Sequence, residues 1–379
     1  MRLLHTADLH LGRQFGGLSL EADQQAVLDQ IARAIVDHQA DILIIAGDIF
    51  DRAAPPEQAV RQFNTFLSRV ARESSAAVVI IAGNHDSAHR IAAMAVMADE
   101  RRVLIRGVVR ADEKPLVLHD AYGAVAISGL PFCYEHAARE CFAGQEIATP
   151  QDVLAAQVAA AQRQVPENAR WVITAHAFVS GAMGSSSEKR LSVGGIETVS
   201  PDVFAGAHYV ALGHLHRPQS VGAHHIRYAG SPLAFGFDEA GAGKSMSLVE
   251  IGAAGAVTIA DIPFAPSRGV RVLTGRHADL LQEQTSEDFI KVVLTDEAPV
   301  IDGMKRLREV FPNACELVYA RDERAPSVKS LEGAVREALS PLELIGGFLQ
   351  QVGGDAITDP ERAIVVSALH AVQNAETAA

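Results

Sequence analysis

Five short apolar runs in this sequence each end in side chains that can bind a metal ion. In chain order, these side chains are Asp8 and His10, Asp48, Asn84, His176, and finally His214 and His216. Carboxylate and amide oxygens mixed with imidazole nitrogens, without a thiolate, suit manganese, iron or zinc. The set is too large for one tetrahedral zinc ion, and it suits two ions that share a bridging carboxylate. Two such ions can clamp a phosphate ester and generate the hydroxide that attacks it.

The recurrence of this pattern carries the prediction, because each signal alone is weak. The dipeptides Gly-Asp and Gly-Asn are common in turns after strands. His5 lies inside the first apolar run, where we expect a packed core histidine. His208, His224 and His225 lie at the beginnings of runs, where we expect surface or structural roles. Because D-x-H, GD, GNHD, H and GHLH follow successive apolar runs, it is improbable that they are only ordinary turn residues.

The elements that must position these groups are short strands alternating with helices. Strands are predicted at 2–8, 41–48, 76–86, 124–131, 171–177, 209–216, 225–232, 245–251 and 256–264, and helices at 21–38, 55–73 and 149–164. This order is typical of a mixed α/β sandwich. Loops at the carboxyl ends of parallel strands converge on one crevice, so parallel pairing would bring the seven side chains together.

The last two candidates, His214 and His216, are two residues apart, and such residues in a strand point the same way. Gly213 and Pro218, however, mark the end of that strand. We therefore expect the two imidazoles to diverge after it.

The pattern changes near residue 267. Strands at 270–275, 289–296 and 315–320, with helices near 277–283 and 301–310, predict a small α+β unit. Amphipathic helical stripes follow within 340–354 and 358–372. Little neighbouring chain remains to bury these stripes, so a partner protein is expected to cover them.

Composition narrows the class of protein. The chain has 379 residues, 48% of them hydrophobic and 21% charged, which is ordinary for a globular protein. No signal-peptide pattern and no membrane-length apolar run is apparent, and the three cysteines suggest no disulfide framework, so a cytoplasmic location is expected. The net charge of −13 argues against a generally basic nucleic-acid coat, although bound metal ions can still supply positive charge to a phosphate-binding cleft.

The motifs DLHLG, GDIFD, GNHDS and GHLHRP, with His176 between the last two, resemble those of the calcineurin-like metallophosphoesterases. The longer stretches LLHTADLHLGRQF, IIAGDIFDRAAPP and RYAGSPLAFGFDE resemble the SbcD-like nucleases within that superfamily. The resemblance covers about the first 265 residues. It implies a four-layer β-sandwich flanked by helices at 1–266, an α+β DNA-contacting cap at 267–328, and a C-terminal helical segment at 329–379 that docks on a coiled coil.

The resemblance also implies a role for each site residue. Asp8, His10 and His216 would hold one ion, Asp48 would bridge both ions, and Asn84, His176 and His214 would hold the second; both ions are expected to be manganese. His85 resembles the catalytic histidine of the family, placed to stabilise the transition state or to protonate the leaving oxygen. The alternative for His85 is to orient a ligand, and Asp86 is a candidate for the same kind of supporting contact.

One position departs from the family. Several relatives carry a histidine, thought to contact substrate phosphate, where this chain has Asp51. A carboxylate cannot replace it in that contact, so we assign Asp51 no substrate-binding role. Arg13, Arg52, Arg90, Arg217 and the pair 189–190 lie on loops near the expected metal edge, and any of them could neutralise DNA phosphates or simply be solvated.

The function implied is a double-strand exonuclease and single-strand or hairpin endonuclease, working in DNA repair, recombination and replication with an SbcC-type coiled-coil ABC ATPase. A homodimer within a heterotetramer is expected, through the helix near 57–72 or the segment near 90–98. DNA recognition is expected to lack sequence specificity. The alternatives are an SbcC-independent phosphoesterase or exonuclease that acts on another phosphodiester, and a non-catalytic scaffold. A non-catalytic scaffold would be expected to have lost some of the metal ligands. All seven candidate ligands are present in this sequence, which argues against a scaffold.

Overall fold

The structure is a computed structural model that describes residues 1–96, 98–188, 198–324, 358, 362 and 364. By internal contacts, the chain forms two compact units. The first comprises Met1–Val292 and Val300–Leu317, and the second comprises Val293–Pro299 and Val318–Ala379. The predicted C-terminal helical segment at 329–379 lies outside the described residues apart from the three isolated positions, and the pair 189–190 also lies outside them.

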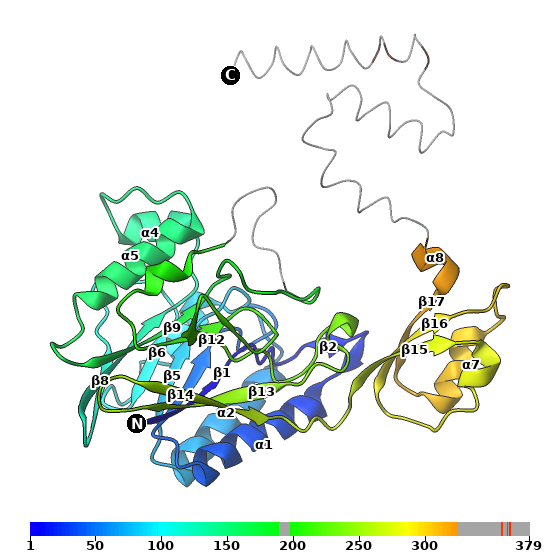
Figure 1. Cartoon of the computed structure of the whole chain (residues 1–379), viewed down its shortest axis with the longest axis horizontal. Coiled ribbons are helices and arrows are strands. Elements are labelled where there is room, and N and C mark those ends of the chain that lie inside the picture. Colours follow the sequence, from blue (N-terminus) through cyan, green and yellow to red (C-terminus); the bar gives the residue numbers. More distant parts are fainter. Residues whose placement is uncertain (97, 189–197, 325–357, 359–361, 363, 365–379) are drawn as a thin grey trace. The chain divides into compact units, whose positions relative to one another are not determined.

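Two six-stranded sheets form the centre of the first unit (Figure 1). The first sheet has the order β14-β13-β1-β4-β5-β6, with bounds Val257–Pro263, Ser245–Ile251, Arg2–Thr6, Ile42–Ala46, Ala77–Ile81 and Val103–Arg106. The second has the order β11-β12-β10-β9-β8-β7, with bounds Gln219–Val221, Ala223–Tyr228, Tyr209–Gly213, Arg170–His176, Gly123–Leu130 and Leu116–Asp120. All nine strands predicted up to residue 264 are present, whereas β6, β7 and β11 were not predicted.

Strand direction decides where the loops go. In the first sheet β1, β4, β5 and β6 are mutually parallel, and in the second β8, β9, β10 and β12 are parallel. The strands β13, β14, β7 and β11 pair antiparallel at or near the sheet edges. The expected parallel arrangement of the strands that carry the candidate residues is therefore confirmed.

Apolar side chains on both faces of each sheet explain the layering. Leu3, Ile44 and Val79 of the first sheet pack with Val172 and Ala211 of the second in one buried cluster between the sheets. Strands buried on both faces read as continuous apolar runs, which is why these short runs were recognisable in the sequence. With helices on the two outer faces, the expected four-layer architecture is confirmed.

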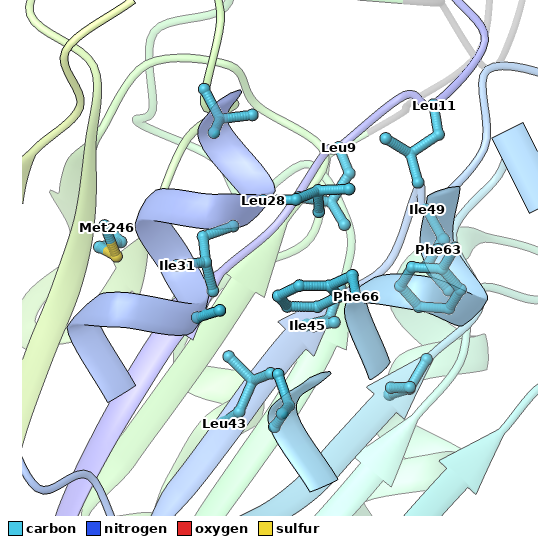
Figure 2. Packing of buried hydrophobic residues seen from close by; sticks show 14 of the residues in the cluster. Leu9, Leu11, Leu28, Ile31, Leu43, Ile45, Ile49, Phe63, Phe66 and Met246 are labelled. Carbon is cyan, nitrogen blue, oxygen red and sulfur yellow. The ribbon is translucent and has the colours of Figure 1, made fainter. Parts of the chain in front are cut away.

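Helices α1 (Glu21–Asp37) and α2 (Glu57–Glu73) cover the outer face of the first sheet. Figure 2 shows Leu28 and Ile31 of α1 and Phe63 and Phe66 of α2 packed near Leu43 and Ile45 of β4. Burying a side chain such as Phe63 contributes about 1.5–3 kcal/mol. These helices thereby fix the strand ends that carry the first candidate residues.

The outer face of the second sheet is covered by α5 (Pro150–Gln162) and a short 3₁₀ helix, Pro201–Phe204. Helix α5 begins at a capping box in which Asp152 donates its backbone N–H to Thr149 Oγ1 and accepts the Thr149 N–H at 2.9 Å. This start agrees with the helix predicted at 149–164. The smaller helices are α3 (Ala88–Ala93) and α4 (Glu135–Cys141).

A three-stranded sheet of order β15-β16-β17 follows, with bounds Val270–Gly275, Phe289–Leu294 and Ala314–Tyr319. Its helices are α6 (His277–Leu280), α7 (Gly303–Val310) and α8 (Ala320–Arg324). The small α+β unit is therefore present as elements, while its proposed boundaries at 267 and 328 stay predictions. A short hairpin, β2 (Gln14–Phe15) and β3 (Leu18–Ser19), and a 3₁₀ helix, Phe237–Glu239, are also present. Within the described residues, no helix combines the length and the apolar character that a membrane span needs.

Candidate metal centre

The carboxyl ends of strands from both sheets meet at one edge of the sandwich. Asp8 and His10 follow β1, Asp48 follows β4 and Asn84 follows β5, whereas His176 ends β9 and His214 and His216 follow β10. Six of these side chains are buried, and Asn84 is half-buried. The structure thus brings together all seven residues that the sequence singled out.

Backbone strain is concentrated in these loops. Asp8, His10, Asp48 and His214 have positive φ angles of 54°, 43°, 50° and 102°, in the left-handed region that non-glycine residues rarely adopt. Each such conformation costs on the order of 1–3 kcal/mol and persists only when the surroundings hold it in place. The strain indicates that the loops are shaped to aim these side chains.

Two glycines allow the loops to approach each other closely. A Cβ at Gly213 would lie 1.9 Å from the carbonyl oxygen of Ala46, and one at Gly83 would lie 2.2 Å from Asp48 Oδ1. Both contacts are impossible for any other residue without movement of the backbone or of the candidate ligand. The glycines in the GNHD and GHLH motifs are therefore required by packing between the loops.

The first cluster consists of Asp8, His10 and His216, whose potential ligand atoms lie within 4.8 Å of one another. Nε2 of His10 and Nε2 of His216 are 3.2 Å apart. Both Asp8 carboxylate oxygens accept the backbone N–H of His214, at 3.0 and 3.2 Å. The loop after β10 is therefore tied directly to the loop after β1.

The second cluster surrounds Asn84. Its Oδ1 lies 3.0 Å from His176 Nε2 and 3.1 Å from His214 Nδ1. Asp48 lies between the clusters, with Oδ2 3.5 Å from His176 Nε2 and 3.7 Å from His10 Nε2. His214 and His216 thus point to different partners, as expected from the end of β10.

The electrostatics of the site favour a cation. Burial lowers the pKa of His10 well below its ordinary value and that of His214 to about 3, so both imidazoles are neutral. Burial would raise the pKa of Asp48, but the neighbouring imidazoles, His176 foremost, lower it, so this carboxylate is ionised. Burial would lower the pKa of His176, but Asp48 raises it to about 9. A bound cation would take the place of that proton, because an imidazole binds metal only when deprotonated.

The hydrogen-bond pattern provides a separate test of whether the residues fit a metal. His176 Nδ1 lies 2.9 Å from the Ala46 carbonyl and donates to it, so Nε2, which faces Asn84 Oδ1, is the nitrogen that would offer a lone pair once its proton is displaced. His10 Nδ1 makes no hydrogen bond and lies 3.7 Å from Asp51 Oδ1, which favours a proton there and leaves Nε2 as a lone pair facing His216. Lone pairs that face one another without an intervening hydrogen suit shared cations, so the donor set fits the expected ions.

His85 lies beside these clusters and forms a further metal-capable group with His10 and Asp51. Its backbone N–H donates to Asp48 Oδ1 at 2.8 Å, and its Nδ1 lies 2.7 Å from the carbonyl oxygen of Asp51. Donation from Nδ1 to that carbonyl fixes the tautomer and leaves Nε2 free. The ring is half-buried and packs edge-on to His10, with centroids 4.8 Å apart. This arrangement is compatible with proton transfer, and the role of His85 stays a prediction.

Asp86 supports the loops without facing the clusters. Its two carboxylate oxygens accept backbone N–H groups of Ile49, Phe50 and Gly83 at 3.0–3.1 Å. Burial, with Asp48 nearby, raises the pKa of Asp86 to about 7. The carboxylate therefore fastens the loop after β4 to the loop after β5, which agrees with the supporting contact expected of it.

Sequence analysis missed a network that holds His216. Nδ1 of His216 donates to Ser187 Oγ at 2.6 Å, and Ser187 Oγ donates to Glu239 Oε1 at 2.7 Å. The buried Lys244 ammonium donates to Glu239 Oε2 and, at 2.8 Å, to the His216 carbonyl. A proton held on Nδ1 leaves Nε2 of His216 as the metal-facing atom. Only Glu239 had any sequence signal, within the quoted stretch RYAGSPLAFGFDE.

The arginines predicted near this edge differ in whether protein contacts hold their side chains. Arg13 lies 4.6 Å over the Phe235 ring and donates to the Ser187 carbonyl at 3.1 Å, and Arg217 donates to the Asp238 carbonyl at 3.0 Å. Arg52 and Arg90 are exposed. None of these contacts tests DNA binding, so the four arginines stay candidates.

Comparisons with known proteins agree with this geometry. Residues 1–218 match the family described as calcineurin-like phosphoesterase. The chain is 30% identical over 362 residues to a Staphylococcus saprophyticus protein named as the SbcD subunit of the nuclease SbcCD, and the match covers 94% of this chain and 95% of the relative. The chain belongs to the SbcD family of calcineurin-like phosphoesterases. The predictions of this family, of its fold and of a hydrolase acting on phosphodiester bonds are confirmed.

Two further matches complete the comparison. Residues 266–353 match a family described as the type 5 capsule protein repressor C-terminal domain. The crystal structure of TT1561 of Thermus thermophilus aligns with 69% of this chain and 98% of its own chain, at 14% identity and a TM-score of 0.39.

Proposed function

We propose that this chain is a manganese-dependent DNA nuclease that degrades double-stranded ends and opens hairpins, acting with an SbcC-type coiled-coil ABC ATPase in DNA repair and recombination. The similarity to a relative named as a subunit of the nuclease SbcCD supports this proposal, because it extends over nearly the full length of both chains. The assignment of individual ligands and of His85 is part of the same proposal.

The convergence of seven metal-capable side chains on one edge is the observation that carries the proposal. Asp8, His10 and His216 would hold one ion, Asn84, His176 and His214 the other, and Asp48 both. The bound ions would supply charge neutralisation on the phosphate and an activated water. Six of the seven residues are buried, and opposed pairs of their side-chain atoms lie 3.0–3.7 Å apart.

The chain's own side chains would then orient the proposed metal ligands and protonate the leaving oxygen. Ser187 keeps the proton of His216 on Nδ1, and the Ala46 carbonyl does the same for His176. His85, with Nδ1 bonded to the Asp51 carbonyl, would present Nε2 to the phosphodiester and hold or donate a proton at the leaving oxygen. Asp51 contributes this carbonyl rather than a phosphate contact.

The proposal is tested by a nuclease assay on linear and hairpin duplexes, with Mn²⁺ or Mg²⁺ and with or without the ATPase. We expect cleavage with Mn²⁺, with hairpin opening dependent on the ATPase. Hydrolysis of a small phosphodiester such as a cyclic nucleotide, without cleavage of any DNA, would contradict the nuclease assignment and favour the alternative phosphoesterase.

The partner is tested separately. The segment 329–379, with its two amphipathic stripes, is the proposed docking element, and the assembly is proposed to contain two copies of this chain. Truncation near residue 335 should preserve hydrolysis of a small phosphodiester and weaken co-purification with the ATPase. Unchanged co-purification would contradict the docking assignment.

A further inference from the structure

A cavity of about 580 Å³ shares a wall with the candidate metal centre. It lies between the loop after β8, the beginning of α5 and the loop after β9, and His176 is among its lining residues. The loop after β8 is fastened to the loop after β5, which carries Asn84, by a 2.9 Å hydrogen bond from Phe132 N to the Ala82 carbonyl. The cavity therefore lies beside the edge at which a phosphate would be cleaved.

The lining of this cavity suits a flat, uncharged ring. Three aromatic side chains, Phe132, Tyr134 and Phe178, contribute to it. Phe132 and Tyr134 pack edge to face with centroids 4.9 Å apart, and the ring of His136 stacks on Tyr134 at 5.8 Å. Tyr134 is still 44% exposed, so part of its ring is open to a ligand. Among the described lining residues, Glu135 is the single permanently charged one. A phosphate has no permanent cationic partner there, whereas an aromatic ring has faces to stack on.

A buried amide in the wall adds a polar contact. Gln157 of α5 is 5% exposed, and its side chain forms no hydrogen bond with any described residue. An amide group carries both donors and an acceptor. A ligand with its own donors and acceptors would satisfy it, as the polar edge of a nucleobase does.

We propose that this cavity binds the base of a nucleotide that adjoins the scissile phosphate, unstacked from its neighbours. The rings of Tyr134, Phe132 and Phe178 contact the faces of the base, and Gln157 contacts its polar edge. The inference rests on the proposed nuclease function and deepens it. Unstacking a base costs least where it is unpaired or at a fraying end, so the cavity gives a physical reason for the cleavage of ends and hairpin loops.

The test removes the base from the substrate and the ring from the protein. A hairpin substrate with one mapped cleavage position is prepared intact and with a single abasic residue on the 5′ or on the 3′ side of that position, and all assays contain Mn²⁺ and the ATPase. The variants are Tyr134→Ala, which removes an exposed ring, and Ala148→Phe, which fills the cavity at an exposed lining residue. Tyr122→Ala is the matched control, because Tyr122 is 62% exposed and does not line the cavity.

For the wild type, we expect kcat/KM to fall about 10- to 100-fold when the base is missing on one of the two sides. Tyr134→Ala and Ala148→Phe should show a similar loss on the intact substrate and little further loss on the abasic one, because both changes remove the same contact. The loss should lie mainly in KM, and Tyr122→Ala should behave as the wild type. Gln157→Leu should change the relative rates for different bases at that position, with thermal unfolding confirming that the variant folds.

Two results would overturn the inference. Equal cleavage of intact and abasic substrates by the wild type would show that no base is bound, while leaving the nuclease function standing. If Tyr134→Ala and the abasic residue lower kcat/KM by factors that multiply, the Tyr134 ring does not contact the missing base. Failure of the wild type to cleave any DNA with Mn²⁺ would overturn the nuclease function and this inference together.

Discussion

Strand β10 carries histidines at both of its ends, and the two ends differ in what surrounds them. At the carboxyl end, His214 and His216 are buried among side chains from four other loops. At the amino end, His208 Nδ1 accepts the backbone N–H of Trp171 at 3.0 Å, and His224 of the neighbouring β12 is exposed. His208 and His224 line a small cavity of about 360 Å³, and neither joins a metal-capable cluster within the described part of the chain.

The comparison shows that the position of a histidine matters more than its presence. The carboxyl ends of the parallel strands bring carboxylates and an amide to His214 and His216. At the amino end, the described residues that line the cavity are histidines and small or apolar residues. A metal site needs converging ligands with their lone pairs exposed to one point. We therefore expect substitutions at the two ends of β10 to differ sharply.

The largest effect is expected for Asp48→Asn. Asp48 is the ionised carboxylate between the two clusters, so its loss should weaken both ions and lower phosphodiester hydrolysis by about 10³-fold or more. The measurement is hydrolysis of a small phosphodiester with Mn²⁺, together with metal content. Activity within about tenfold of the wild type would contradict the bridging role.

His85→Gln is expected to lower hydrolysis by about 10²- to 10⁴-fold, the range typical of a lost general acid or base. Metal content should stay near that of the wild type, because His85 is not among the seven proposed ligands. Joint loss of metal and activity would instead make His85 a ligand.

Ser187→Ala should lower the affinity for one ion by about 10- to 100-fold, because His216 loses the acceptor that keeps its proton on Nδ1. Calorimetric titration with Mn²⁺ measures this affinity without relying on activity. Ser186→Ala is the matched control, since the neighbouring hydroxyl bonds Asp238 and not a candidate ligand. Equal affinities for the two variants would exclude the orienting role of Ser187.

The smallest effect on the site is expected for His208→Ala at the other end of β10. Metal content and hydrolysis should stay within about twofold of the wild type, while the free energy of unfolding should fall by about 1–3 kcal/mol, because the Trp171 N–H loses its acceptor. Denaturant unfolding measures this change. Loss of bound metal in His208→Ala would contradict the expected difference between the two ends of β10.

Sequence reasoning predicted the central strands and the site because both depend on local patterns. Buried parallel strands are continuous apolar runs, and each candidate residue directly follows one. Strands β6 and β7 were not predicted, since VLIR and LVLHD are short and become strands by pairing with β5 and β8. Ser187 and Lys244 were also not predicted, because their contacts with His216 join residues 28–29 positions apart across a loop.

The central claim is that the seven side chains hold two ions, and counting bound Mn²⁺ per chain tests it most directly. We predict two ions for the wild type and for His208→Ala, and one for His214→Ala and for His216→Ala. A wild type that binds a single ion, or a His208→Ala variant that loses one, would contradict the account.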